Sequence, residues 1–441
     1  MFNFEQHIRE IRMKQHIYYH ALLRVIFLIL VVPISVLGQG RNPEVLIYGD
    51  GIDAYTAAIQ SAKSRLHTIW VTESRDLRSS LNLPAGNIQS HNQLDGGIWA
   101  ELLAKTMGSE HPNDSVVSRA KNPFNPQLVL NEMEKELDEY AHLHIYFQPG
   151  LRSVQKKRRN WQVRLNNGTR FSVRSIVDAS PEGRIAQESG IQPDFGKADQ
   201  EIRKTGVIVT DLGGKAQALG LTQLIPTEEE NLFFTKHNPY LSPLLRDHID
   251  DLPLLAHAGQ AVGAAAAYVA FYKTTSDQIE VRQVQAELLQ YGARIVPYQD
   301  ILIQDPHFQA IQRIGALAIF EPTLGAEGRY LFSGEKRVTS SEIEPVLHTL
   351  FSRSQIWFKD RQSTTRSDTL SLGELLSLIK YIAHRGNELD EQVENLWSRR
   401  WGFEADFDPT MPITRRHFSV LMDEFVKPFD VRIDRQGRIT R

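Results

Sequence analysis

The sequence predicts an α/β protein with a doubly wound parallel sheet, followed by a small helical C-terminal domain. Three observations support this fold class. Residues 45–73 read as a strand, a glycine turn, a helix and a second strand. Residues 161–178 read as a β-hairpin followed by an apolar strand. Residues 308–441 contain helix-capping sequences, each followed by an amphipathic segment.

The size and charge of the chain narrow the classes of function. With 441 residues and 41% hydrophobic content, it can bury one sizeable core and one or two smaller ones. A formal net charge of -3 gives no basic footprint for nucleic acid, and we expect the basic run 156–159 to be a solvated hairpin turn. The lack of cysteine excludes disulfides, thiol catalysis and thiolate metal sites. No metal site is predicted, because His142 and His144 have no carboxylate cluster beside them.

Residues 1–38 have the pattern of a secretory signal peptide. Lys14 and Arg24 precede the apolar block 25–32, and small residues follow up to Gly38. We therefore expect cleavage near Gly38 and an exported protein that is periplasmic, secreted or held at the cell envelope. A membrane anchor is the alternative, but the apolar block is short for a segment that spans a bilayer.

The first predicted strand, 45–48, leads into the sequence Gly-Asp-Gly-Ile-Asp-Ala, which has the G-x-G-x-x-[G/A] spacing of a dinucleotide-binding turn. Gly49 permits a tight turn, Gly51 lets the backbone approach a pyrophosphate, and Ala54 lets the next helix pack close to the strand. That helix, 53–64, offers free N–H groups to phosphates at its start. Glu73 ends the next strand, 67–72, where a carboxylate can accept the ribose hydroxyls of a dinucleotide. A plain α/β turn is the alternative.

The elements after this unit are a helix at 126–140, a strand at 142–147, a hairpin at 161–165 and 170–173, and a strand at 175–178. The last strand runs into Asp178-Ala-Ser-Pro-Glu-Gly183. Many flavoproteins return the chain to the cofactor through such a β-meander. The alternative is a hairpin followed by an ordinary polar loop.

A second cluster of small residues, 258–267, is predicted to begin a helix. Gly259 and Gly263 are four residues apart, so they share one face near the N-terminal end of that helix. Their lack of a side chain allows very close backbone approach, either to a neighbouring helix or to a cofactor. The local sequence favours neither interpretation over the other.

Taken together, these motifs resemble the bacterial FAD-dependent oxidoreductases of the type often labelled xanthan-lyase-like, which are relatives of the fumarate reductase flavoprotein fold. The resemblance covers roughly residues 43–300. It implies a Rossmann-like FAD-binding domain with a β-rich insertion at about 190–255, and FAD as the cofactor. The residues that it places at the cofactor are Gly49, Gly51, Ala54, Glu73, Asp178, Ala179, Gly183, Gly259, Ala261 and Gly263.

Three features depart from the family pattern. Members usually have a Gly-Gly pair shortly after the ribose acid, and this chain has Leu-Arg-Ser-Ser at 77–80. The middle position of the glycine turn is Asp50, whose charge would have to point away from phosphate. The stretch between Gly190 and the glycine-containing helix is short for a full substrate-capping domain.

The C-terminal region, 308–441, is predicted to be a helical repeat-like accessory domain. Phe332-x5-Val-Thr339 recurs 75 residues later as Phe407-x5-Ile-Thr414, each before an amphipathic helix. This region resembles S-layer-homology-type modules, which implies association with the cell envelope; a helical domain that packs on the first domain is the alternative. His417 is expected to be an exposed residue of the cap region.

The resulting hypothesis is an exported FAD-dependent oxidoreductase that transfers a hydride from an unknown organic substrate to flavin. The catalytic residues stay unknown, and the substrate or redox partner is unnamed; His237 and His257 lie near the expected flavin, but lone histidines are more often structural. One alternative is a degenerate, non-catalytic flavoprotein-like scaffold that acts as an envelope binding or interaction module. Another, a polysaccharide-cleaving enzyme, is suggested by the family label alone.

Overall fold

The computed structural model describes residues 43–89, 94–196, 202–212, 215–228, 230–246, 248–326, 329–364 and 367–440. The chain from Pro43 onward forms one compact unit. The predicted signal peptide, residues 1–38, lies outside the described residues.

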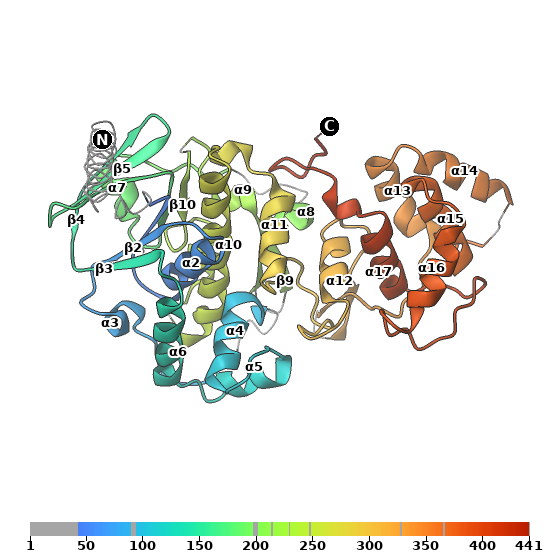
Figure 1. The fold of residues 1–441 in the computed structure, drawn as a ribbon, viewed down its shortest axis with the longest axis horizontal. Helices are drawn as coiled ribbons and strands as arrows, with labels where there is room; N and C mark the ends of the chain where they lie inside the picture. Colours follow the sequence, from blue (N-terminus) through green and yellow to red (C-terminus); the bar gives the residue numbers. More distant parts are fainter. Residues whose placement is uncertain are drawn as a thin grey trace, which may run out of the picture. The chain divides into compact units, whose positions relative to one another are not determined.

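The centre of the fold is a five-stranded sheet in the order β10-β7-β1-β2-β3, and each neighbouring pair in it is parallel (Figure 1). Its strands are β1 (Val45–Tyr48), β2 (Thr68–Thr72), β3 (Leu143–Phe147), β7 (Ser175–Asp178) and β10 (Leu232–Phe234). Helix α2 (Ile52–Lys63) joins β1 to β2. The predicted α/β fold with its β-α-β unit is confirmed, as are the predicted third strand and the returning strand.

The two faces of this sheet are buried in different cores. Side chains alternate along β1, so Val45 and Ile47 belong to the large core whereas Leu46 and Tyr48 belong to a smaller one on the opposite face. Both sets are almost fully buried. A strand covered on both faces has to be apolar throughout, which is why β1 reads as a continuous apolar run.

Helices cover the face of the large core. Helix α2 packs along α10 (Leu252–Phe271), which also contacts β7 and α4 (Gly97–Thr106). Helix α10 with the turn before it, Ile249–Phe271, is long and apolar enough to cross a membrane, but 83% of its most apolar window is buried inside the protein. The helix is therefore apolar because it lies in the core of the protein. The remaining helices of this region are α3 (Leu77–Leu81), α5 (Asp114–Lys121), α6 (Pro126–Asp138) and α11 (Val281–Gln290).

A small antiparallel sheet and a short helix cover the other face. The sheet runs β4-β5-β6, with β4 (Leu151–Lys157), β5 (Asn160–Leu165) and β6 (Arg170–Val173), and the helix is α7 (Arg184–Ser189). Trp161 and Val163 of β5 are buried against this side of the parallel sheet. The predicted hairpin is confirmed by the pairing of β5 with β6. The basic run ends β4 and forms the turn to β5, where Arg158 has a φ of 57°.

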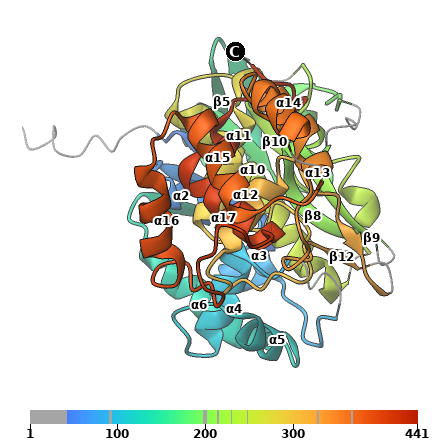
Figure 2. The same ribbon diagram turned by 90° about the vertical axis from the view of Figure 1, so that its right-hand side faces the viewer.

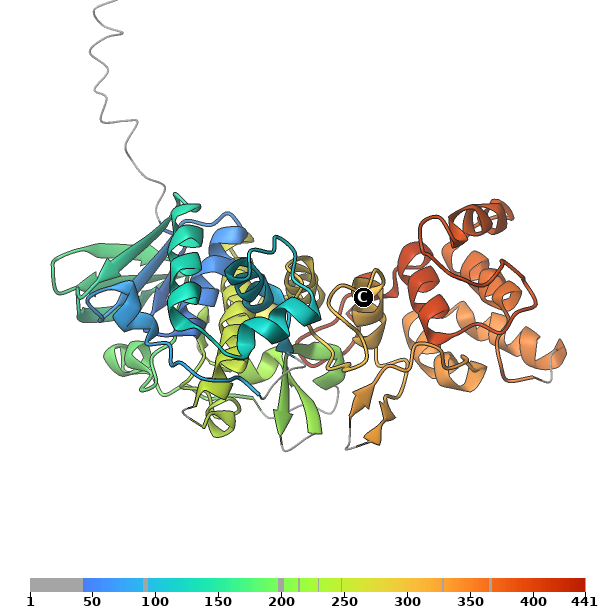
Figure 3. The same cartoon turned by 90° about the horizontal axis from the view of Figure 1, so that it is seen from below.

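The stretch between α7 and β10 contains four short elements in its described residues. They are α8 (Ile202–Thr205), the antiparallel hairpin of β8 (Gly206–Leu212) and β9 (Lys215–Gly220), and α9 (Leu221–Leu224). In Figure 3 the strands of this hairpin, in light green, lie at the lower edge of the view.

The C-terminal region is helical, as predicted (Figures 1 and 2). Its elements are α12 (Phe308–Gly315), a two-residue pairing of β11 (Thr323–Leu324) with β12 (Tyr330–Leu331), α13 (Ser340–Leu350), α14 (Ser354–Thr364), α15 (Leu372–Ala383), α16 (Glu388–Trp397) and α17 (Arg415–Phe425). Thr339, Ser371 and Thr414 cap α13, α15 and α17 through their side-chain oxygens. The three capping segments also pair with one another through isolated bridges. The repeat therefore has a third copy, centred on Ser371, between the two copies that the sequence shows.

The expectation that His417 is exposed was wrong. Its side chain is buried between the rings of Trp397 and Phe403, at centroid distances of 5.0 and 4.6 Å. The backbone N–H of Thr414 donates to its Nδ1 at 3.3 Å. The imidazole thus takes the place that Glu342 and Glu374 have in the caps of α13 and α15.

Candidate functional site

The turn between β1 and α2 has the backbone form that the glycine pattern predicts. Gly49 and Gly51 have φ angles of 121° and 104°, a region that favours glycine. Gly51 is the N-cap residue of α2, and no side chain caps the helix there. The free N–H groups of the first turn are therefore directed at the space in front of Gly51.

Gly49 allows this turn to touch the end of β7. A Cβ atom on Gly49 would lie 2.7 Å from the backbone carbon of Ala179 and from the nitrogen of Ser180. The Ala179 N–H donates to the Tyr48 carbonyl at 2.7 Å, and the Trp70 indole donates to the Gly49 carbonyl at 2.9 Å. The structure thus brings together two predicted site segments, 49–54 and 178–183, that are far apart in the sequence.

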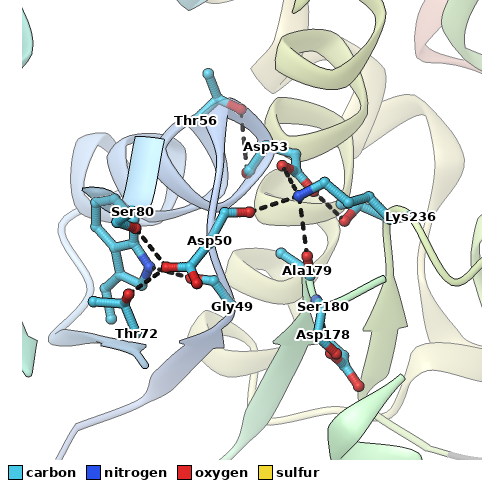
Figure 4. A network of polar contacts seen from close by, with 12 residues as sticks. Gly49, Asp50, Asp53, Thr56, Thr72, Ser80, Asp178, Ala179, Ser180 and Lys236 are labelled. Atoms are coloured by element: carbon cyan, nitrogen blue, oxygen red, sulfur yellow. Dashed lines mark hydrogen bonds and ion pairs between the residues drawn. The ribbon is translucent and has the colours of Figure 1, made fainter. Parts of the chain in front are cut away.

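The side chain of Asp50 points toward β2 and α3 (Figure 4). Its Oδ1 accepts hydrogen bonds from the hydroxyls of Thr72 and Ser80, the latter at 2.7 Å. Ser80 lies in the segment that replaces the expected Gly-Gly pair. Ser80 of this segment and Thr72 of β2 therefore hold the Asp50 carboxylate against the end of β2 and helix α3.

Asp178 holds the loop after β7 in shape. Its carboxylate accepts from the N–H of Ser180 at 3.0 Å and from the N–H of Ile185 at 2.8 Å. Burial raises the pKa of Asp178 to about 6, although these hydrogen bonds oppose the shift. Gly183 is needed in this loop because a Cβ atom there would lie 2.5 Å from the ring of His237. Asp178 and Gly183 therefore shape the loop through contacts with other residues of the protein, and their contact with a cofactor stays a prediction.

Glu73 lies at the end of β2, as predicted, and its side chain is exposed. It accepts a hydrogen bond from the hydroxyl of Tyr48. Burial, followed by the Glu73 carboxylate, raises the pKa of Tyr48 well above its ordinary value, so the phenol stays a donor. The Glu73 carboxylate is therefore oriented by β1 and remains open to solvent, as a ribose-binding acid must be.

Lys236 is a residue of this site that the sequence analysis missed. Its Nζ donates to the Asp50 carbonyl at 2.6 Å, to Oδ1 of Asp53 at 2.7 Å and to the Ala179 carbonyl at 3.2 Å (Figure 4). Lys236 follows the short strand β10. Three residues are too few to show a pattern of apolar and polar side chains that predicts a strand, so the sequence did not place Lys236 at this turn. Beside Lys236 is a cavity of about 530 Å³ that Gly183, His237 and Phe195 help to line.

The structure supports the packing interpretation of the glycines in α10. A Cβ atom on Gly263 would lie 2.8 Å from the Cα of Ala57, and one on Gly259 would collide with the Asp53 carbonyl and the Thr56 hydroxyl. Helix α10 begins at Leu252, so the expectation that Gly259 lies at its N-terminal end was wrong. Ala261 is fully buried in the large core, as is Ala54 in α2. For these four residues, contact with a cofactor stays a prediction.

The two histidines considered for the site differ in surroundings. His257 lies in α10 and is buried, which lowers its pKa to about 4 and keeps the imidazole neutral. His237 follows Lys236, and its ring covers Gly183. Within the described ranges, no group of three or more His, Asp or Glu residues could hold a metal ion.

Comparison with known families identifies the segment that contains this site. Residues 44–247 match the family described as FAD dependent oxidoreductase. This part of the chain is similar to the FAD-dependent oxidoreductases, and FAD is the cofactor that the match supports. It includes the β1–α2 turn, the end of β7 and Lys236, and it spans a little under half of the chain. The sequence matches none of the curated proteins with which it was compared.

Among solved structures, the chain is similar to several enzymes at low identity. The p-nitrophenol 4-monooxygenase PnpA from Pseudomonas putida DLL-E4 is 10% identical over 57% of this chain and 86% of that one, with a TM-score of 0.31. PqsL from P. aeruginosa is 12% identical over 57% and 91%, also with a TM-score of 0.31. The tetracycline destructase Tet(51) is 15% identical, with a TM-score of 0.24, and the chain spans 42% of its length. Scores this low transfer nothing about substrate.

The residues of the β1–α2 turn fit the pyrophosphate of FAD under one condition. The lack of a Cβ on Gly51 leaves a space in front of the helix N-terminus, where a dinucleotide pyrophosphate binds in this fold. Oδ1 of Asp53 and the Nζ atom of Lys236 each lie 2.9 Å from the position of that missing Cβ. Both atoms are the ends of side chains, so the space becomes available when the Asp53–Lys236 pair moves aside.

Proposed function

We propose that the chain is an exported FAD-dependent oxidoreductase that oxidises an organic substrate by transferring a hydride to flavin. The observation that carries this proposal is the glycine turn of β1–α2, packed against the end of β7 within a segment that matches the FAD-dependent family. Gly51 and the first turn of α2 would hold the pyrophosphate, and the exposed Glu73 would accept the ribose hydroxyls.

Flavin, when bound, supplies the hydride acceptor, and the protein supplies binding and orientation. The cavity beside Lys236 lies between the carboxyl ends of β7 and β10, where ligands of open α/β sheets bind. His237 and Asn238 also line it. It is the best-placed space for a substrate or for the rest of the cofactor.

The test is the absorption spectrum of the chain from Gln39 onward, incubated with FAD and then separated from unbound FAD by gel filtration, together with the affinity of FAD for a Glu73→Ala variant. Flavin bands and a loss of affinity of about tenfold or more in the variant are expected, because an exposed acid can be removed without disturbing the core. Glu134→Ala, a change of an exposed acid on α6, is the matched control and should bind FAD as the unmodified chain does. Protein that keeps no flavin bands after incubation with saturating FAD and removal of the unbound FAD would contradict the proposal.

A non-catalytic scaffold is the second candidate, and one observation favours it. The space in front of Gly51 contains the ammonium of Lys236, held by three protein oxygens. A chain that keeps no flavin once unbound FAD is removed, while its C-terminal domain binds isolated cell-envelope material, would support this candidate. Export and envelope association through the S-layer-homology-like region are parts of the proposal, tested by the location of the protein in fractionated cells.

A further inference from the structure

The space that a dinucleotide-binding turn keeps for phosphate contains a cation of the protein itself. Figure 4 shows the amine of Lys236 in front of the β1–α2 turn, between Asp53 and Ala179. Its Nζ atom lies 2.9 Å from the position that a Cβ on Gly51 would take. In the G-x-G-x-x-[G/A] pattern the second glycine has no side chain, and the pyrophosphate can therefore approach the backbone there. Lysine and pyrophosphate thus need the same space.

Lys236 is firmly held in this position. An ammonium group has three N–H donors, and all three find acceptors, at 2.6 Å on Asp50, 2.7 Å on Asp53 and 3.2 Å on Ala179. The side chain is only 18% exposed. The lysine therefore joins the start of α2, the end of β7 and the end of β10, and a ligand must break these contacts to enter.

Its partner Asp53 takes the electrostatic role of a bound anion. The side chain is fully buried and lies in the first turn of α2, where the helix dipole favours negative charge. It also accepts a hydrogen bond from the hydroxyl of Thr235. An acid at this position would repel a pyrophosphate in the same space unless a cation lies between the two charges.

We propose that the Asp53–Lys236 ion pair is an internal latch on the nucleotide site, and that Lys236 binds the pyrophosphate once the latch opens. The inference rests on the proposed function, because it assumes that this turn binds FAD. The latch lowers the affinity for FAD, since part of the binding free energy is used to separate a buried pair. Lys236 then places its charge between the phosphates and Asp53, where it offsets their repulsion.

Two single substitutions should therefore act in opposite directions. Asp53→Asn removes the carboxylate that holds Lys236 and repels phosphate, so FAD and ADP should bind about tenfold more tightly or better. Lys236→Met leaves an unpaired buried carboxylate facing the phosphates, so both ligands should bind at least about tenfold more weakly. The double variant has neither charge and should bind with an affinity between those of the two single variants.

The experiment measures dissociation constants for FAD and for ADP by titration calorimetry on the chain from Gln39 onward. It compares the unmodified protein, the two single variants and the double variant, with circular dichroism to confirm folding. Asp53→Ser replaces Asp53→Asn if the latter does not fold, because its hydroxyl can still accept from Thr235. Lys63→Met is the matched control: Lys63 also belongs to α2 and pairs with Glu101 at 2.7 Å, but at the other end of the helix.

The outcomes separate the latch from the flavin function. Tighter binding by Asp53→Asn supports the latch, and does so most strongly if the unmodified chain binds FAD poorly. Equal affinities in all variants, or weaker binding by Asp53→Asn, would overturn the latch and leave the flavin function standing. No binding of FAD or ADP by any variant would overturn both.

Discussion

Gly263 of α10 lies so close to Ala57 of α2 that a Cβ atom on the glycine would be 2.8 Å from the alanine Cα and from its carbonyl oxygen. The contact sets the distance between the helix that follows the first strand and the helix that crosses the sheet. Because α2 starts at the nucleotide turn, the packing of α10 also fixes where that turn lies.

Gly263→Ala should therefore destabilise the protein by about 3 kcal/mol, because backbone atoms of α2 would have to move to admit a methyl group. Gly259→Ala should cost at least as much, since its Cβ would meet the Asp53 carbonyl. Denaturant unfolding measures both. Gly196→Ala is the control, because a Cβ there would have its nearest neighbour at 3.6 Å. A near-neutral Gly263→Ala would show that the helices are not in contact.

The sequence predicted the sheet better than it predicted the site. Apolar runs such as Val45–Tyr48 are dictated by burial on both faces, and glycines 49 and 51 by backbone conformation, so both are visible locally. Lys236 was missed because its role depends on a three-residue strand and on a partner 183 residues earlier. No local pattern encodes such a pairing.

The glycines of α10 and the histidine of α17 were ambiguous for another reason. A small residue permits close approach to any neighbour, so Gly259 and Gly263 could be assigned only when α2 was seen opposite them. His417 was expected to be exposed because charged residues surround it in the sequence. Its neighbours in space are instead Trp397 and Phe403, which come from a different segment.

Arg415 joins two repeats of the C-terminal region and should be essential for its stability. The side chain is fully buried, its guanidinium lies 2.8 Å from the Glu342 carboxylate, and it donates to the Phe332 carbonyl at 3.0 Å. Arg415→Met should cost about 3 kcal/mol, because it leaves the Phe332 carbonyl without its donor and removes the buried guanidinium from the Glu342 carboxylate, which keeps Lys336 at 2.9 Å. Chemical denaturation measures the loss, and the exposed Arg337→Ala is the control. A loss below that of the control would contradict this role.

Asp178 should be required as an acceptor, whatever its charge. An asparagine has one carbonyl oxygen, so Asp178→Asn cannot accept from the N–H groups of both Ser180 and Ile185. We expect a loss of about 2 kcal/mol in the free energy of unfolding. The raised pKa of about 6 adds a dependence on pH: the folded state holds this proton more strongly than the unfolded chain, so its contribution to stability falls as pH rises from about 4 to 6. A pH-independent difference between the variant and the unmodified chain would contradict the shift.

His417 should give a pH dependence of the opposite sign. Burial lowers its pKa to about 4, against an ordinary value of about 6.5, and a protonated Nδ1 could no longer accept from the Thr414 N–H. The unfolded chain therefore binds the proton first as the pH falls. The stabilisation is fully present above pH 6.5 and is lost progressively toward pH 4, by on the order of 2 kcal/mol.

His417→Gln isolates this effect from those of Asp178 and of the buried His257, which titrate in both proteins. A glutamine at the third helical position can still accept from the cap backbone, so the variant keeps the capping arrangement without a group that titrates. The difference in unfolding free energy between the unmodified chain and the variant should be larger at pH 7.5 than at pH 4.5. If the two proteins lose stability in parallel over this range, the imidazole is not neutral and buried as the structure places it.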